Sequence, residues 1–230
     1  MRKWIGMSCI ILGITCLLAA LGFVIYNRWE AKRAADITQS LLADIQFAMD
    51  ENIGNDPEQN EDRNPVQNEN GNPDQNEDED PDSMKNDALM EDADIPTEMP
   101  TIKVDGYDCI GVLSVPVLEA ELPVLTDWSY KKLKKAPCHY YGSYYEKNFI
   151  IAAHNYRAHF GRLSELQAGD IVIFTDVHGV AHYYEVALLE TLPPTATKEM
   201  ITSGFDLSLY TCTPGGGNRV TVRCRSLEPK

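Results

Sequence analysis

The sequence has few basic residues for its acidic content. Its 230 residues include 20 Lys and Arg against 35 Asp and Glu, which gives a net charge of -15 at pH 7. Between Asp50 and Thr101 there are 18 acidic and 2 basic residues, a net charge of -16, which leaves about +1 for the rest of the chain. No basic run indicates nucleic-acid binding, so we predict no nucleic-acid partner.

Cysteine pairs with zinc-binding spacing are also missing. None of the six cysteines forms a CxxC pair, so we predict no zinc site. We also predict no other metal site and no cofactor. Two of them, Cys9 and Cys16, lie in an apolar N-terminal run. The remaining four lie in the C-terminal half: Cys109, Cys138, Cys212 and Cys224. Outside the cell four cysteines can pair in three ways, and the sequence favours none of them.

Charge is absent from the 22 residues between Ile5 and Tyr26. A helix of about 20 apolar residues crosses a bilayer, and Trp4, Tyr26 and Trp29 lie at the ends of the run, where aromatic rings favour the interface. A cleaved signal peptide is the alternative, but its apolar region is usually about 7 to 15 residues long. We therefore predict an uncleaved transmembrane anchor over residues 1–29. Basic residues flank both ends, so the positive-inside rule does not settle its orientation.

Residues 30–50 have the periodicity of an amphipathic helix. Apolar side chains recur at every fourth position: Ile37, Leu41, Ile45 and Met49. We predict a juxtamembrane stalk, with packing against a neighbouring chain as the alternative.

An acidic tract with prolines at eight-residue intervals occupies residues 51–100. Such polar repeats bury too little apolar surface to offset the entropy of ordering, so we predict a disordered linker. A calcium loop is the alternative, because Asp74 and the alternating acidic and amide residues after it resemble the start of an EF-hand. Glu79, however, stands where that loop needs glycine.

The composition becomes globular over residues 101–230. Short β-rich runs alternate with turn signals, including a hairpin with its turn at 176–179, and short helices or loops are expected at 131–135 and 194–203. Seven to eight short strands at this spacing predict a mostly all-β domain, a closed or nearly closed β-barrel.

The last predicted hairpin, LSLYTCTPGGGNRVTVRCR, places Cys212 at the mouth of a glycine-rich turn. Pairing Cys212 with Arg219 aligns the apolar rows of the two strands, and opposed side chains then begin about 5 Å apart. Arg223 is four residues further along, about 13 Å away, so Arg223→Ala is expected to be mild. A reactive thiol needs a positive neighbour or a base, which makes Cys212 and Arg219 candidate site residues. Cys224 falls on the apolar face and is expected in the core.

Five histidines are candidates for the base: His139, His154, His159, His178 and His182. His154 is favoured because it ends the predicted buried strand NFIIAAH, where a rigid scaffold would hold the imidazole. The other four remain open, and a structural role is possible for each. His178 and His182 flank a turn, so their spacing does not indicate a helical metal site.

These segments, in this order, resemble the sortase family. LYTCTP, followed by an arginine on the next strand, resembles the TLXTC signature, and NFIIAAHN resembles the strand that ends in the catalytic histidine. DCIGVLSVPVLEAELPV is similar to the first strands of the family. The resemblance covers about residues 107–225 and implies a sortase-like closed barrel; Ala153 departs from it, where many members have glycine.

The resemblance implies a cysteine transpeptidase with Cys212 as nucleophile and His154 as acid/base. Arg219 would stabilise the oxyanion or position substrate, and Thr211, which matches the motif's threonine, would help to orient it. Sortases cleave an LPXTG-like sorting signal and pass the acyl group to an amine of a cell-wall precursor. The implied partners are sorting-signal-bearing surface proteins, the peptidoglycan precursor amine and the membrane.

The implied location is the Gram-positive cell membrane, with a single span and an extracellular catalytic domain. The sequence shows neither a lid motif nor a second anchor, so we expect a wall-anchoring type similar to class B or D. Glu119 and Glu121 are candidates for calcium binding, although a solvated turn is the simpler interpretation. Two alternatives stay open: a cysteine peptidase that hydrolyses the same bond, and a non-catalytic β-domain on a stalk.

Overall fold

The computed structural model describes residues 2–54 and 98–227. Helix α1 (Arg2–Gly54) is continuous, so the predicted anchor, the predicted stalk and the first residues of the predicted linker form one helix. Most of the predicted disordered linker, with its calcium-like run, lies outside the described residues.

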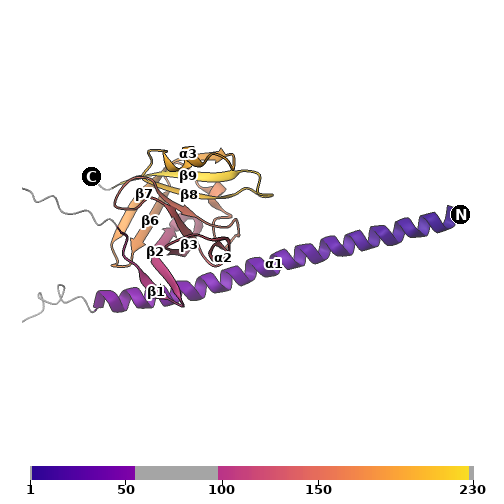
Figure 1. Ribbon diagram of the computed structural model, residues 1–230, viewed down its shortest axis with the longest axis horizontal. Helices are drawn as coiled ribbons and strands as arrows, with labels where there is room; N and C mark the ends of the chain where they lie inside the picture. Colours follow the sequence, from indigo (N-terminus) through magenta and orange to yellow (C-terminus); the bar gives the residue numbers. More distant parts are fainter. Residues whose placement is uncertain (1, 55–97, 228–230) are drawn as a thin grey trace, which may run out of the picture.

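Nine strands form one sheet in the order β1-β2-β3-β4-β5-β8-β9-β7-β6, and β2 also pairs with β6. This last pairing closes β2 to β9 into a barrel, with β1 added beside β2 (Figure 1). The strands are β1 (Ile102–Val104), β2 (Tyr107–Val115), β3 (Ala120–Leu125), β4 (Cys138–Tyr141), β5 (Phe149–Ala152), β6 (Ile171–Asp176), β7 (Ala181–Leu192), β8 (Leu207–Cys212) and β9 (Arg219–Ser226). Short helices α2 (Tyr130–Leu133) and α3 (Thr197–Ile201) connect strands. The prediction of a closed barrel of seven to eight strands with short helices is confirmed.

Alternate residues of each strand fill the barrel, as the period of two requires. Phe149 and Ile151 of β5 and Leu207 and Leu209 of β8 are fully buried in one cluster. Each such side chain contributes about 1.5–3 kcal/mol through the hydrophobic effect. Because these residues point inward, the residues between them point to the outer face, where the candidate site lies.

Closure of the barrel depends on a glycine in β2. Gly111 pairs with Asp176 of β6 and has a positive φ of 151°. A Cβ atom at this position would lie 2.1 Å from the carbonyl oxygen of Thr175, far inside contact distance. Only glycine allows the two backbones to approach this closely.

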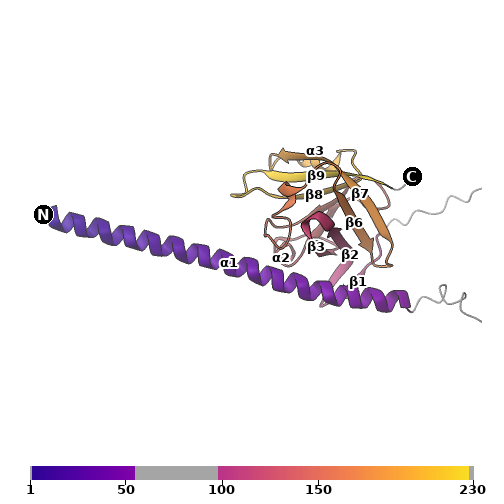
Figure 2. The same ribbon diagram turned by 180° about the vertical axis from the view of Figure 1, so that it is seen from behind.

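Helix α1 packs along the outside of the barrel (Figures 1 and 2). Its buried positions form a stripe: Ala34, Thr38, Leu41, Ile45 and Met49. The last three join a second apolar cluster with side chains of β1 to β4, among them Cys109 and Cys138. The sequence left open whether this helix is a free stalk or contacts a neighbouring chain; in the structure its apolar face contacts the chain's own barrel.

The N-terminal part of α1 extends away from the barrel (Figure 1). From Leu12 to Ile25 its large apolar side chains are more than half exposed, with Leu17 at 72%. Within the described residues, α1 is the one helix long and apolar enough to cross a membrane.

Candidate active site

The candidate nucleophile and base lie side by side because two neighbouring strands run parallel. β5 pairs with β8 so that Ala152 is opposite Tyr210, and the Ala153 amide donates to the Tyr210 carbonyl at 3.2 Å. His154 and Cys212 each lie two residues beyond this pair. Both therefore lie at the same end of adjacent strands, on the outer face of the barrel.

The candidate arginine enters from the other neighbour of β8. The antiparallel register runs from Leu207 opposite Cys224 to Cys212 opposite Arg219, which confirms the predicted pairing. Arg219 Nη1 donates to the carbonyls of Gly216 and Asn218 at 3.2 and 3.1 Å. Nothing in the described chain accepts a hydrogen bond from its other terminal nitrogen, so that nitrogen is available to a substrate.

A groove of about 210 Å³ joins these groups, and His154, Thr211, Cys212 and Arg219 all line it. Along one side is a series of aromatic rings that begins at Tyr210, beside Cys212. The Tyr210 and Tyr140 centroids are 5.3 Å apart, those of Tyr140 and Trp128 5.8 Å, and those of Trp128 and Tyr130 5.9 Å. Residues of the segment from Pro193 to Met200, which includes α3, also line the groove. The groove is mostly apolar, with charge concentrated near the thiol.

Among the five histidines, only His154 lines this groove. The ring nitrogens of His139 contact the carbonyls of Thr126 and Gly142 at 3.0 and 2.7 Å. His159 is buried against α1, His178 is exposed in the β6–β7 turn, and His182 lies 3.6 Å from Asp176. The position of His154 thus favours it as the base over the alternatives that the sequence left open.

The electrostatic environment of His154 includes a residue of the N-terminal helix. Partial burial lowers the pKa of His154, and the Lys134 ammonium lowers it further, while the Glu30 carboxylate of α1 opposes them. Glu30 accepts a 2.7 Å salt bridge from Lys134. Nε2 of His154 has no hydrogen-bond partner within the described residues. This coupling could not be predicted from the sequence, because Glu30 and Lys134 are 104 residues apart.

Thr211 supports the site through a buried hydrogen bond between its strand and the residue before His154. Its side chain is buried, and Oγ1 donates to the Ala153 carbonyl at 2.8 Å. The hydroxyl therefore links β8 to β5 directly before His154. This contact favours positioning of His154 over direct contact with substrate.

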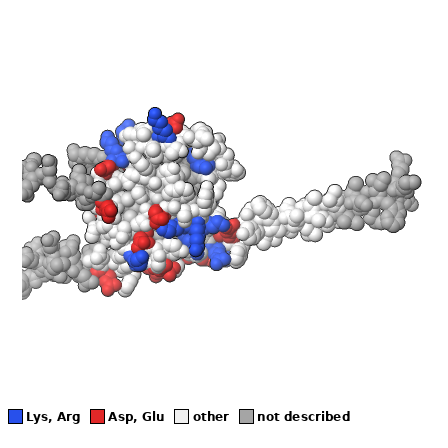
Figure 3. Space-filling model, in the orientation of Figure 1, with Lys and Arg blue, Asp and Glu red and all other residues white. Residues whose placement is uncertain are grey.

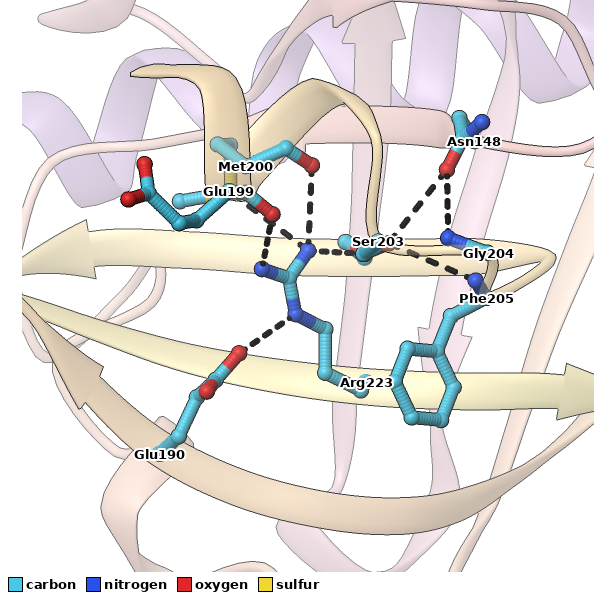
Figure 4. A network of polar contacts seen from close by, with 9 residues as sticks. Asn148, Glu190, Glu199, Met200, Ser203, Gly204, Phe205 and Arg223 are labelled. Carbon is cyan, nitrogen blue, oxygen red and sulfur yellow. Dashed lines mark hydrogen bonds and ion pairs between the residues drawn. The ribbon is translucent and has the colours of Figure 1, made fainter. Parts of the chain in front are cut away.

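Arg223 is fully buried, with 1% exposure, which the sequence did not indicate. It donates to Glu190 at 2.7 Å, to Ser208 Oγ at 2.9 Å, and to the carbonyls of Met200 and Glu199 at 3.2 and 3.0 Å (Figure 4). The last two contacts hold the end of α3, which forms one side of the groove. The expectation that Arg223→Ala is mild was argued from distance to the thiol alone and does not take this network into account.

The other barrel cysteines are chemically shielded. Burial raises the pKa of Cys109, Cys138 and Cys224 to about 12, so these thiols stay protonated at neutral pH. Cys212 is partly exposed, and the thiols of Cys16, Cys109, Cys138, Cys212 and Cys224 are free.

The structure shows Glu121 in a contact with α1, where its Oε2 accepts a 3.4 Å hydrogen bond from Gln46. Glu119 ends a short 3-10 turn with left-handed backbone geometry. The part of the chain that the structure describes contains no group of three His, Cys, Asp or Glu side chains arranged to hold a metal ion.

The barrel brings a cysteine, a histidine and an arginine together at adjacent strand ends, and these are groups that thiol acyl transfer uses. A family model described as Sortase domain matches residues 113–227, half of the chain. The protein belongs to the sortase family, whose members are generally cysteine transpeptidases. The subclass stays open.

Solved structures similar to this chain are sortases of several types. Sortase A from Corynebacterium diphtheriae is 23% identical with a TM-score of 0.49, and the match covers 54% of this chain and 63% of that one. Sortase C from Streptococcus pneumoniae is 25% identical with a TM-score of 0.48, and the match covers 53% of this chain and 67% of that one. A sortase D5 transpeptidase from Clostridium perfringens is 20% identical with a TM-score of 0.48, and the match covers 53% of this chain and 80% of that one. A search of curated proteins found no match.

Proposed function

We propose that this protein is a membrane-anchored transpeptidase that cleaves an LPXTG-like sorting signal. It transfers the acyl group, through a thioester on Cys212, to the amine of a cell-wall precursor. The span lies in α1 within residues 1–29, and the catalytic domain, residues 101–230, lies outside the cell. The observation that carries this proposal is the convergence of Cys212, His154 and Arg219 on one groove.

The first half of the reaction forms the thioester. The Cys212 sulfur attacks the scissile carbonyl carbon while its proton passes to His154, and Arg219 donates hydrogen bonds to the oxygen as it becomes negative. The carbon–nitrogen bond then breaks, and the protonated His154 ring gives its proton to the departing amine. The acyl group stays on sulfur while the C-terminal part of the sorting signal leaves.

The second half releases the acyl group to the acceptor. The precursor amine attacks the thioester carbonyl, and His154 accepts a proton from the attacking nitrogen. His154 passes this proton to the sulfur as the carbon–sulfur bond breaks, which returns the thiol. Thr211 fixes the strand end before His154 through its bond to Ala153. No metal or cofactor takes part in this scheme.

The test uses the full chain in detergent or nanodiscs with a fluorogenic sorting-signal peptide and an amine acceptor. Replacing Cys212 or His154 by alanine is expected to remove nearly all turnover, and Arg219→Ala is expected to remove about 100-fold or more. Arg225→Ala, on the same strand but exposed, is the matched control and should keep full turnover. Full turnover of both Cys212→Ala and His154→Ala would refute the proposed roles of these residues, and absence of turnover in the unaltered chain would favour the non-catalytic domain.

The same assay separates the transpeptidase from a peptidase. With acceptor present, a mass increase on the peptide product shows amine transfer. Hydrolysis at a rate that acceptor does not change, with no transfer product, would favour the peptidase.

A further inference from the structure

Basic side chains that are scattered in the sequence gather where α1 meets the barrel. Seven of them lie on α1 just after the uncharged run and on or directly after α2: Arg28, Lys32, Arg33, Lys131, Lys132, Lys134 and Lys135. Figure 3 shows Lys and Arg concentrated here, beside the uncharged part of α1. We call these seven residues the basic junction.

The junction keeps a positive charge after its internal ion pairs are counted. Glu30 pairs with Lys134, and Asp127 pairs with Lys132. Asp36 is the third acidic side chain on the neighbouring part of α1. Seven positive charges against three negative ones leave an excess on a chain whose overall charge is -15.

The position of the junction follows from the helix. The uncharged run ends at Tyr26, and Glu30, which holds Lys134, is one turn further, about 6 Å along the axis. A hollow between the two helices is lined by Tyr26 and Trp29 together with Lys134 and Lys135. The segment directly after α2 therefore reaches the aromatic end of the apolar run, and Lys134 and Lys135 lie at the level of the lipid headgroups if residues 5–26 span the bilayer.

We propose that the basic junction binds the headgroups of anionic phospholipids. This inference rests on the proposed membrane anchor but not on the proposed chemistry. Positive side chains beside a span attract anionic lipid over about a Debye length, roughly 8 Å at physiological salt. Tyr130 and Leu133 of α2 also line the groove, so headgroup contact at α2 holds the groove beside the membrane surface. Headgroup contact also explains why basic residues follow the span on its outer side, where the positive-inside rule does not expect them.

Lysine acetylation of the full chain in nanodiscs tests this surface. We compare discs of phosphatidylcholine alone with discs that contain equal parts of phosphatidylglycerol and measure labelling at each lysine by mass spectrometry. In the anionic discs, labelling of Lys131, Lys134 and Lys135 is expected to fall about threefold or more, and high salt should restore it. Lys198 on α3, across the barrel from α1 (Figure 1), is exposed and should label equally in both lipids.

A pair of charge-reversal variants provides the matched comparison. Lys131→Glu with Lys135→Glu should remove the lipid dependence of Lys134 labelling, whereas Lys147→Glu with Lys198→Glu should preserve it. Equal labelling of the junction in both lipids, or equal protection of Lys198, would overturn the proposal, and a chain that fails to insert would overturn the anchor as well. An inactive Cys212→Ala chain that keeps the footprint shows that lipid binding is separate from catalysis.

Discussion

Two opposite charges from outside β5 influence the protonation of His154. The Lys134 ammonium disfavours the protonated ring, and the Glu30 carboxylate favours it. Because Glu30 belongs to α1, the proton affinity of the candidate acid/base depends on the docked helix as well as on the barrel. Protonation of the leaving amine requires the imidazolium, so these two residues influence the pH range of the reaction.

Substitution of the two partners is expected to shift the pKa of His154 in opposite directions. Lys134→Met removes a positive charge and should raise it, and Glu30→Gln removes a negative charge and should lower it. The shifts are measured from the His154 ring signals in an NMR pH titration of the full chain. Lys147→Met is the control and should leave the titration unchanged. Shifts of the same sign in both variants would contradict this account.

The buried ring of His159 is expected to make the stability of the docked helix depend on pH. Burial, and secondarily the neighbouring His154, lower its pKa from 6.5 to about 4. Its Nε2 is hydrogen-bonded to Thr38 Oγ1 of α1 at 2.7 Å. The unfolded chain takes up a proton near pH 6.5, while the folded chain does not until about pH 4. The stabilisation is therefore fully present above pH 6.5 and is lost as the pH falls towards 4.

Thermal unfolding in mild detergent checks this prediction. Between pH 7 and pH 5 the contribution of His159 should fall by on the order of 2 kcal/mol. In His159→Gln the loss between the two pH values should shrink, and in His178→Gln, which changes an exposed ring, it should not. An unchanged pH dependence in His159→Gln would show that another group is responsible.

At the scale of elements, Arg223 joins β9, β7 and the end of α3 into one unit. Replacing Arg223 by Met leaves Glu190 without its partner and two carbonyls of α3 without donors. Loss of one partner of a fully buried ion pair costs about 3–5 kcal/mol; because the Glu190 side chain is 32% exposed, we expect a smaller cost here, and a clear drop in the unfolding temperature. In the fraction that folds, KM for the peptide should rise more than kcat falls, because the wall of the groove is loosened.

Arg225→Met is the control for this substitution. Arg225 lies on the same strand but is exposed, with its guanidinium 4.8 Å from the Phe205 ring. Its loss should change stability by less than about 1 kcal/mol. Equal stability of the two variants would mean that the Arg223 network has no net effect.

The closing hairpin shows what was predictable from sequence and what was not. The pairing of Cys212 with Arg219 followed from matching apolar rows, because a register shift by one residue would turn every side chain to the wrong face. The same alternation placed Arg223 on the outer, polar face, which is correct. Its burial was not predictable, because α3 returns over that face from a segment with no strong pattern of its own. Thr211 was assigned from the motif, and its bond to Ala153 needed the parallel pairing of β5 with β8.

At the scale of the molecule, the periodicity of residues 30–50 predicted an amphipathic helix but not its partner. Leu41, Ile45 and Met49 were identified correctly, and the stripe continues through Thr38, not Ile37. The contact between Thr38 and His159 joins residues 121 positions apart. A long acidic tract separates the two segments, so no local pattern connects them.

Removal of α1 is expected to expose a face of the barrel that is buried in the full chain. Cys109 and Cys138 are fully buried in the cluster beneath Leu41 and Ile45. In a chain that begins at residue 98, both thiols should react with N-ethylmaleimide within minutes, whereas a chain that begins at residue 30 should protect them. Cys224, inside the barrel, is the internal control and should be protected in both. Protection of Cys109 in the shorter chain would show that the barrel is complete without the helix.

The unbroken course of α1 from the apolar run to the barrel has a consequence for the orientation of the barrel relative to the apolar run. Each residue of an α-helix turns the chain by about 100° and advances it by about 1.5 Å. One residue inserted between Tyr26 and Glu30 would thus swing the catalytic barrel about a quarter of a turn around the anchor. Four inserted residues would restore most of the original heading and lift the barrel by about 6 Å. The number of residues in this short interval therefore sets the direction in which the groove faces around the axis of α1.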